Sequence, residues 1–441
     1  MLQRKIESKI SNWIKNSRNA LLVSGARQVG KTYIIRKCLE GNGYPFVEIN
    51  LIEHPEFVEV INQSANVEDL KINITALLGN ELGEGTFIFI DEIQEAKDIV
   101  TKIKFWVDEG SYRYILSGSL LGVELYNIRS APVGYLEEIK MYPMDFEEFA
   151  RASGVKDDVI DYLRQSYADR KPVGKLLHDT MMKHFRRYLV VGGMPSAVQR
   201  YIDTKDISEV SIIQRNIINL YRLDFTKYEK REKKLQLINI YNQIPSQLLK
   251  QNRRFNYSDL KKGLRYEYVE NSFVWLYSAG VVLPVFNSTE PRVSLNQNVK
   301  SSLVKLYYSD VGLLCEQYGG ALKSGILLGD DKINVGGIYE NVVAQELRCH
   351  GFDIYYYNSK KQGELDFVIE KDLSVLPIEV KSGKDYYYHS AISNALKNKE
   401  YEMKEACVFT NYDLREEESI VYYPVYMCMF MENEYTYPVL D

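Results

Sequence analysis

The chain has 441 residues, which is long for a single hydrophobic core, and we expect two or three domains. Hydrophobic residues make up 45% and charged residues 26% of the chain, a composition that excludes a largely disordered protein. The formal net charge of −5, from 55 basic and 60 acidic residues, argues as an average against a basic nucleic-acid-binding protein.

The average hides a separation of charge along the chain. Residues 211–305 carry 16 basic and 7 acidic side chains, whereas residues 306–441 carry 12 basic and 23 acidic ones. Residues 1–135 and 136–210 are close to neutral. One basic segment is therefore available for an acidic partner such as DNA.

Cysteine usage and hydropathy indicate a cytoplasmic protein without a membrane partner. The five cysteines are scattered, form no CxxC pair, and follow no secretory leader, so we expect reduced thiols. No apolar stretch reaches the roughly 18–20 residues that span a bilayer. The histidines show no zinc-binding spacing.

An amphipathic helix is predicted over residues 2–14, followed by a buried strand at residues 20–23. This strand leads into a G-x-x-x-x-G-K-[ST] motif and a helix, the context of a phosphate-binding P-loop. The predicted nucleotide-binding residues are Gly25, Ala26, Arg27, Gln28, Val29, Gly30, Lys31 and Thr32. Backbone N–H groups would hold the phosphates, Lys31 would reach the β- and γ-phosphates, and Thr32 would hold Mg²⁺.

The apolar strand at residues 87–90 ends in two acids, Asp91 and Glu92. Asp91 is predicted to support the Mg²⁺ ion, and Glu92 to polarise the water that attacks ATP. A third strand, over residues 112–116, ends at Ser117. Ser117 is predicted either to sense the γ-phosphate and orient the water or to cap the next helix.

At this point the sequence resembles a known family. The segments GARQVGKT, FIFIDEIQ, YILSGSLLG, MYPMDFEEF and YLVVGGMPSAV are similar to those of prokaryotic AAA-superfamily ATPases that carry a second domain of unknown function. The resemblance covers essentially the whole chain and implies a helical lid after about residue 145. Where related ATPases have Gly-Arg, this chain has Gly134-Tyr135, so the resemblance assigns no arginine finger.

The basic middle segment is predicted to form helices followed by a hairpin near residues 281–285, an order typical of a winged helix. One interpretation is contact with nucleic-acid phosphates. The candidate residues are Lys250, Arg253, Arg254, Lys261, Lys262 and Arg265. The other interpretation is a protein-binding winged helix that docks on acidic surfaces.

In the C-terminal segment, a helix over residues 338–348 and three strands are predicted. Asp366 on the second strand and Glu379-Val380-Lys381 on the third have the spacing of the PD-(D/E)XK nuclease core, and Glu340 matches the helix glutamate of that family. Alternation along the strand puts Glu379 and Lys381 on one side.

The predicted chemistry is metal-dependent phosphodiester hydrolysis. Glu340, Asp366 and Glu379 are the predicted ligands of a second divalent ion, and Lys381 is predicted to hold or deprotonate the attacking water. The alternative is a nuclease-like scaffold without activity that binds DNA or a protein.

The predicted fold class is therefore α/β, with three parts. Residues 1–205 would form an AAA-type P-loop core and lid, residues 206–322 a winged-helix domain, and residues 323–441 a nuclease-like domain. The predicted function is ATP hydrolysis that controls DNA engagement and DNA cleavage. The alternative function is a signalling ATPase that binds a protein partner; the sequence does not predict an oligomeric state.

Overall fold

The computed structural model describes residues 2–64, 66–79, 82–96, 98–119, 134–227 and 231–433. Its contacts divide the chain into two units. Unit 1 consists of residues 1–142 and 274–281, and unit 2 of residues 143–273 and 282–441. This division follows contacts, and the three-part division at residues 205 and 322 stays a prediction from the sequence.

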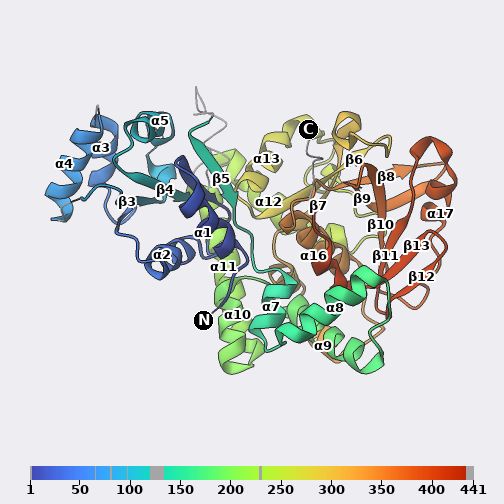
Figure 1. The fold of residues 1–441 in the computed structure, drawn as a ribbon. Helices are drawn as coiled ribbons and strands as arrows, with labels where there is room; N and C mark the ends of the chain where they lie inside the picture. The colour runs from blue at the N-terminus through green and yellow to red at the C-terminus, as the bar shows by residue number, and fades with distance from the viewer. Residues whose placement is uncertain are drawn as a thin grey trace, which may run out of the picture. The chain divides into compact units, whose positions relative to one another are not determined.

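Unit 1 contains a parallel five-stranded sheet in the order β2-β3-β4-β1-β5 (Figure 1). Its strands are β1 (Ala20–Ser24), β2 (Phe46–Asn50), β3 (Phe87–Asp91), β4 (Arg113–Gly118) and β5 (Leu136–Lys140). The three central strands are apolar and buried over nearly their whole length, as expected for a sheet covered on both faces. The prediction of a parallel α/β sheet is confirmed, although the sequence patterns missed β2.

Helices surround this sheet in sequence order. They are α1 (Ile6–Asn16), α2 (Lys31–Gly41), α3 (Glu56–Gln63), α4 (Val67–Leu78), the 3-10 turn η1 (Ile93–Glu95) and α5 (Ile99–Glu109). The predicted amphipathic helix is α1, which buries Ile6, Ile10, Trp13 and Ile14. Its apolar face therefore packs inside unit 1.

Unit 2 begins with a run of helices. They are α7 (Phe146–Ala152), α8 (Asp157–Asp169), α9 (Lys175–Val191), α10 (Pro195–Thr204), α11 (Ile207–Lys227) and α12 (Arg231–Leu248). The later helices are α13 (Glu270–Ser278), α14 (Val311–Tyr318), α15 (Gly320–Leu328), α16 (Gly336–Cys349) and α17 (Ser390–Lys397). The helical segment expected as a lid is present, but its contacts group it with unit 2. Helix α13 starts in unit 2 and ends in unit 1.

The sheet of unit 2 has eight strands in the order β12-β13-β11-β10-β9-β8-β6-β7 (Figure 1). The strands are β6 (Val282–Ser288), β7 (Val299–Tyr308), β8 (Tyr355–Ser359), β9 (Gly363–Lys371), β10 (Ser374–Val380), β11 (Ala406–Thr410), β12 (Arg415–Glu417) and β13 (Ile420–Pro424). Short 3-10 turns complete the unit: η2 (Tyr257–Asp259), η3 (Tyr266–Tyr268), η4 (Leu295–Asn298), η5 (Lys399–Tyr401) and η6 (Val425–Phe430).

The predicted hairpin exists as β6 and β7, but it is not a separate wing. Strand β6 pairs in parallel with β8, through Phe286 and Tyr355, and so extends the C-terminal strands into one sheet. The winged-helix part of the fold prediction is therefore not confirmed. A pairing partner some seventy residues away in the sequence leaves no local signal in the hairpin itself.

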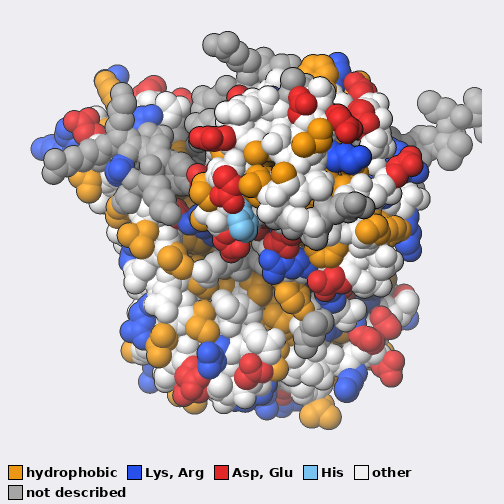
Figure 2. Space-filling model, turned by 90° about the vertical axis from the view of Figure 1, so that its left-hand side faces the viewer, with side chains coloured by type: hydrophobic (Ala, Val, Ile, Leu, Met, Phe, Trp, Pro, Cys, Tyr) orange, Lys and Arg blue, Asp and Glu red, His pale blue; other side chains and the backbone are white. Residues whose placement is uncertain are grey.

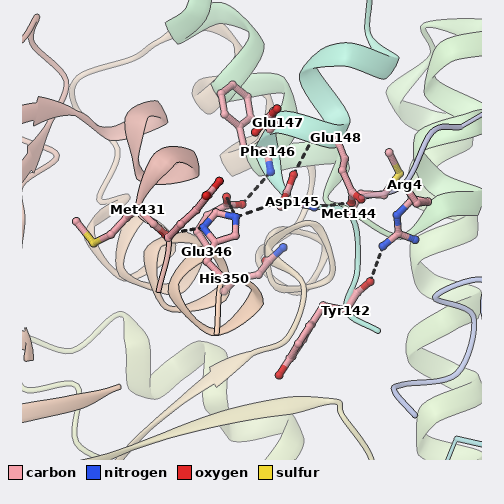
Figure 3. Close-up of polar contacts among 12 residues, drawn as sticks. Arg4, Tyr142, Met144, Asp145, Phe146, Glu147, Glu148, Glu346, His350 and Met431 are labelled. Carbon is pink, nitrogen blue, oxygen red and sulfur yellow. Dashed lines mark hydrogen bonds and ion pairs between the residues drawn. The ribbon is translucent and has the colours of Figure 1, made fainter. Parts of the chain in front are cut away.

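The MYPMDFEEF signature anchors α7 to α16 within unit 2. Asp145 caps α7 by accepting a hydrogen bond from the Glu148 N–H, and the Phe146 N–H donates to Glu346 Oε1 at 2.9 Å. His350 Nε2 lies 3.3 Å from Asp145 Oδ2 and its Nδ1 lies 3.0 Å from the Met431 carbonyl oxygen (Figure 3). Buried polar contacts fix this signature, which gives it a structural role.

The Gly192-Gly193 signature is held by a buried aspartate. The Gly193 N–H donates to Asp310 Oδ2 at 2.6 Å, and the Leu313 N–H donates to Asp310 Oδ1 at 2.9 Å. A Cβ on Gly193 would lie 2.0 Å from the Met144 carbonyl oxygen, so only glycine fits this position. The second signature motif therefore also packs the helices of unit 2 together.

Within the described ranges, no helix is both long enough and apolar enough to cross a membrane. The five cysteines are free thiols, and four of them are buried. On the face drawn in Figure 2, acidic and basic side chains are intermixed. The separation of charge along the sequence therefore does not turn this face into a surface of one sign.

Candidate functional site

The P-loop of unit 1 connects β1 to the N-terminus of α2. Gly25 has a φ of 142°, and a Cβ there would lie 2.1 Å from the carbonyl oxygen of Met141. Gly30, with a φ of 94°, is the N-cap of α2. Only glycine fits these two positions, and the result is a loop whose backbone leads directly into a helix N-terminus, where anions bind.

The side chain of Lys31 is buried and folds back over this loop. Its ammonium group donates to the carbonyl oxygens of Gly25 and Ala26, at 3.0 and 2.9 Å. Burial lowers the pKa of Lys31 to about 8, against the opposing attraction of Glu92 and Asp91. A phosphate would replace the two carbonyl oxygens as acceptor for a lysine already held at the site.

Two hydroxyl groups converge on the carboxylate that ends β3. The Thr32 hydroxyl donates to Asp91 Oδ2 at 2.6 Å, and the Ser117 hydroxyl, from the end of β4, donates to Asp91 Oδ1. Asp91 is 3% exposed. The structure therefore brings together three residues that the sequence predicted separately, from the P-loop and two neighbouring strands.

Glu92 stands directly beside this carboxylate in a strained conformation. Its φ of 59° lies in the left-handed region, and the Gln94 amide donates to its Oε2 at 2.5 Å. Gln28, within the P-loop, has a φ of 65°. Such conformations in non-glycine residues cost free energy and cluster at functional sites. Of the other P-loop residues, Ala26 and Val29 are buried and Arg27 is half-buried.

Arg4 is a residue at this site that the sequence analysis missed. Its guanidinium donates to the Val29 carbonyl oxygen at 3.0 Å and to the Tyr142 carbonyl oxygen at 2.8 Å (Figure 3). Arg4 is 7% exposed and thus ties the P-loop to the chain that follows β5. The motif search gave no signal for it, because an arginine before an amphipathic helix has an ordinary surface explanation.

The last turn of α13 is a second missed element of unit 1. Gly280 has a φ of 73°, and a Cβ there would lie 2.9 Å from the backbone nitrogen of Ala26. The Lys140 ammonium lies 4.6 Å from the ring centre of Tyr277. Residues far along the sequence therefore pack directly behind the P-loop.

A separate cavity of about 570 Å³ lies in unit 2 and contains the predicted nuclease residues Asp366, Glu379 and Lys381. The Val380 N–H donates to Asp366 Oδ2 at 2.9 Å, and Lys381 Nζ lies 2.7 Å from Glu379 Oε1. Glu379 Oε2 is buried and accepts no hydrogen bond from the described residues. Burial, together with the charge of Asp366, raises the pKa of Glu379.

Glu340, the third predicted ligand, lies beneath this cavity and does not line it. Arg253 forms an ion pair with Glu340 Oε1, and the Tyr307 hydroxyl donates to Glu340 Oε2 at 2.9 Å. Burial and the charge of Asp366 raise the pKa of Glu340. Arg253, predicted to contact nucleic-acid phosphates, is instead half-buried against an acid of its own chain.

Lys305 is the residue that sequence reasoning missed in this cluster. It is fully buried on β7, and its ammonium nitrogen lies 2.8 Å from Glu364 Oε1, 3.7 Å from Glu340 Oε2 and 3.8 Å from Asp366 Oδ1. The attraction of these carboxylates raises the pKa of Lys305 against the effect of burial. A lysine within an apolar strand was the available signal.

The remaining basic candidates divide into two groups. Lys250 is paired with Asp259, and Arg254 Nε donates to Asn252 Oδ1 at 3.1 Å. Exposed positions belong to Lys261, Lys262 and Arg265. The exposed group is thus smaller than the charge count of the segment predicted.

Residues 17–150 match a family model described as AAA domain. Residues 182–323 and 335–427 match models described as Domain of unknown function, DUF8612 and DUF4143 respectively. A search of curated proteins gives no match. Together with the P-loop geometry, the first match identifies residues 17–150 as an AAA-type P-loop ATPase domain.

Similar solved structures include the Walker-type ATPase paby2304 of Pyrococcus abyssi, with 14% identity, a TM-score of 0.44, and coverage of 72% of this chain and 96% of that chain. A Thermotoga maritima RuvB variant has 14% identity, a TM-score of 0.30, and coverage of 64% and 89%. The Aeropyrum pernix ORC1 protein in complex with DNA has 13% identity, a TM-score of 0.26, and coverage of 75% and 93%. These overall similarities are weak, and the assignment rests on the AAA domain match and the site.

Proposed function

We propose that the protein binds ATP with Mg²⁺ at unit 1, hydrolyses it, and uses the nucleotide state to control engagement of DNA by unit 2. The observation that carries the ATPase part is the convergence of Thr32 and Ser117 on Asp91, beside a P-loop that only glycine at position 25 allows. This donor set fits a nucleotide and its metal ion, because hydroxyl and carboxylate oxygens are the ligands that Mg²⁺ prefers.

Each residue of the site has a distinct proposed role. The backbone of residues 25–30 and the N-terminus of α2 hold the phosphates, and Lys31 moves its proton-bearing ammonium group from the loop carbonyls to them. Thr32 and Asp91 would hold Mg²⁺, which when bound neutralises phosphate charge. Glu92 accepts a hydrogen bond from the attacking water and orients it, while Ser117 fixes the rotamer of Asp91.

Two variants separate binding from hydrolysis. Lys31→Ala should abolish ATP binding, measured by calorimetry, because the charge that faces the phosphates is lost. Glu92→Gln should bind ATP as the wild type does and lose nearly all turnover, by about 10²-fold or more. The exposed Glu95→Gln removes the same charge from the next turn and should keep full activity. Normal turnover in Glu92→Gln would refute the role of Glu92.

The DNA part of the proposal rests on Lys261, Lys262 and Arg265, which are exposed within the basic segment. The double variant Lys261→Ala/Lys262→Ala should weaken duplex DNA binding and flatten its dependence on salt, because fewer counterions are released. Lys175→Ala/Lys183→Ala removes two exposed lysines of α9 and serves as the matched control. Absence of DNA binding by the wild type at low salt would contradict this part.

The alternative function, a signalling ATPase with a protein-binding unit 2, is favoured by one observation. Lys250 and Arg253, two of the six predicted phosphate contacts, are paired with acids of unit 2. If DNA binding fails while ATP hydrolysis persists, this alternative replaces the DNA proposal. The cytoplasmic location stays a prediction from the sequence.

We do not extend the proposal to metal-dependent DNA cleavage. Within the described residues, no group of three or more His, Cys, Asp and Glu side chains has an arrangement suited to a metal ion. The predicted catalytic role of Lys381 and the predicted metal roles of Glu340, Asp366 and Glu379 stay predictions. The surroundings of Glu340 bear directly on them.

A further inference from the structure

The acidic cluster of unit 2 contains two cations that belong to the chain itself. Lys305 Nζ lies within 3.8 Å of one oxygen from each of Glu340, Glu364 and Asp366. Arg253 pairs with the other oxygen of Glu340. The cluster is therefore crossed by positive charge at the point where its carboxylates approach one another.

The burial of these groups gives the arrangement its weight. Lys305 and Glu340 are both 0% exposed, so neither charge is stabilised by water. Removing a charged group from water costs several kcal/mol unless a partner of opposite sign offsets it. Lys305 is the partner that permits three carboxylates to gather at one place, and they in turn permit a buried lysine.

A divalent cation fits this arrangement poorly. In the role predicted from the sequence, the ion would bridge Asp366 and Glu379, next to an ammonium group that already lies 3.8 Å from Asp366 Oδ1. Like charges at such separations repel strongly in a buried site. Tyr307 and Arg253 also occupy the oxygens of Glu340, which leaves that residue no free position for a metal ion.

We infer that Lys305, supported by Arg253, is a resident counter-ion that takes the electrostatic place of the divalent metal ion at the PD-(D/E)XK-like site. The cluster is thus neutralised without metal, and the cavity that Asp366, Glu379 and Lys381 line does not recruit one. The inference concerns unit 2 alone, so it stands or falls independently of ATP hydrolysis in unit 1.

The test is a gain of metal binding. Mn²⁺ is titrated into the full-length protein without nucleotide, and binding is measured by calorimetry and by the shift in unfolding temperature. Wild type and Asp366→Asn should behave alike. Lys305→Gln should bind Mn²⁺ at least about tenfold more tightly than the wild type, since one charge at this range changes a neighbouring ionic equilibrium by that factor or more. The gain should vanish in Lys305→Gln/Asp366→Asn.

Circular dichroism establishes whether Lys305→Gln folds. If it does not, Lys305→Gln/Glu364→Gln should fold, because that pair of changes removes one charge of each sign from the same contact. Failure of this rescue would overturn the inference. Mn²⁺ binding by the wild type that is lost in Asp366→Asn would also overturn it, and would favour the nuclease prediction instead.

Discussion

Arg4 braces the P-loop from outside the motif that sequence searches recognise. Its two hydrogen bonds to the carbonyl oxygens of Val29 and Tyr142 are charge-assisted and buried. The carbonyl groups it satisfies belong to two segments that approach one another at the mouth of the loop. A side chain outside the motif therefore determines the shape of the nucleotide site.

Replacing Arg4 with alanine should weaken ATP binding. We expect Arg4→Ala to raise the dissociation constant for ATP about tenfold and to lower the free energy of unfolding by about 1–3 kcal/mol, because two buried carbonyl groups lose their partner. Arg18→Ala, at an exposed position after the same helix, is the matched control. Calorimetry and chemical denaturation measure both quantities; unchanged ATP affinity would remove Arg4 from the site.

Asp310 makes the stability of unit 2 depend on pH. Burial raises its pKa to about 6, although the backbone N–H groups around Gly193 and Leu313 act in the other direction. In the unfolded chain the pKa is near 3.8, so between these values the folded state holds the proton more tightly. The stabilisation is complete below about pH 4 and is lost as the pH rises through 6.

The matching variant is Asp310→Asn, which cannot titrate. The free energy of unfolding of the wild type, relative to this variant, should fall by on the order of 2–3 kcal/mol between pH 4 and pH 7. Denaturation at several pH values gives the two curves. A difference between wild type and variant that stays constant across this range would contradict the raised pKa.

At the scale of elements, the end of α13 is the contact most specific to this chain. Residues 274–281 belong to unit 1, while the start of the helix and the following strand β6 belong to unit 2. Gly280 packs against the backbone of Ala26 so closely that its missing side chain is required. A change in the P-loop is therefore transmitted to a segment covalently continuous with unit 2.

Gly280→Ala should lower ATP affinity about tenfold and reduce the unfolding temperature, because a Cβ meets the Ala26 nitrogen at 2.9 Å and alanine disfavours a φ of 73°. Gly263→Ala separates the two causes. Gly263 has a φ of 78°, and a Cβ there would meet no atom within 4 Å. This control should lose some stability and keep its ATP affinity; equal effects on ATP binding in both variants would contradict the contact.

The elements themselves could be predicted where the signal is local. The P-loop, the acidic end of β3, and helix α16 with its three following strands follow from residue patterns a few positions long. The site of unit 1 was predictable for the same reason, since Thr32, Asp91 and Ser117 each end a recognisable motif.

Contacts between distant segments could not be predicted. The pairing of β6 with β8, the place of Gly280 behind the P-loop, and the reach of Lys305 into the acidic cluster depend on tertiary packing. Glu340 was correctly placed on a helix, but its partner Arg253 was expected at a DNA surface. A charged residue has the same sequence signature whether it faces solvent or a buried ion pair.

For the whole molecule, the charge separation seen in the sequence is partly cancelled by folding. Basic residues of segment 211–305 pair with acids of segment 306–441, as Arg253 does with Glu340 and Lys305 with Glu364. Arg292 lies 3.5 Å from Glu400 in the same manner. The surplus available to DNA is therefore smaller than the sequence count, and it lies with exposed residues such as Lys261 and Lys262.

The central claim is that unit 1 hydrolyses ATP in communication with DNA bound elsewhere on the protein. The most direct measurement is the rate of phosphate release from ATP by the full-length protein, with and without duplex DNA, for wild type and Lys31→Ala. We predict hydrolysis by the wild type at a rate that DNA changes, and none by Lys31→Ala under either condition. Equal phosphate release by the two proteins would contradict the account.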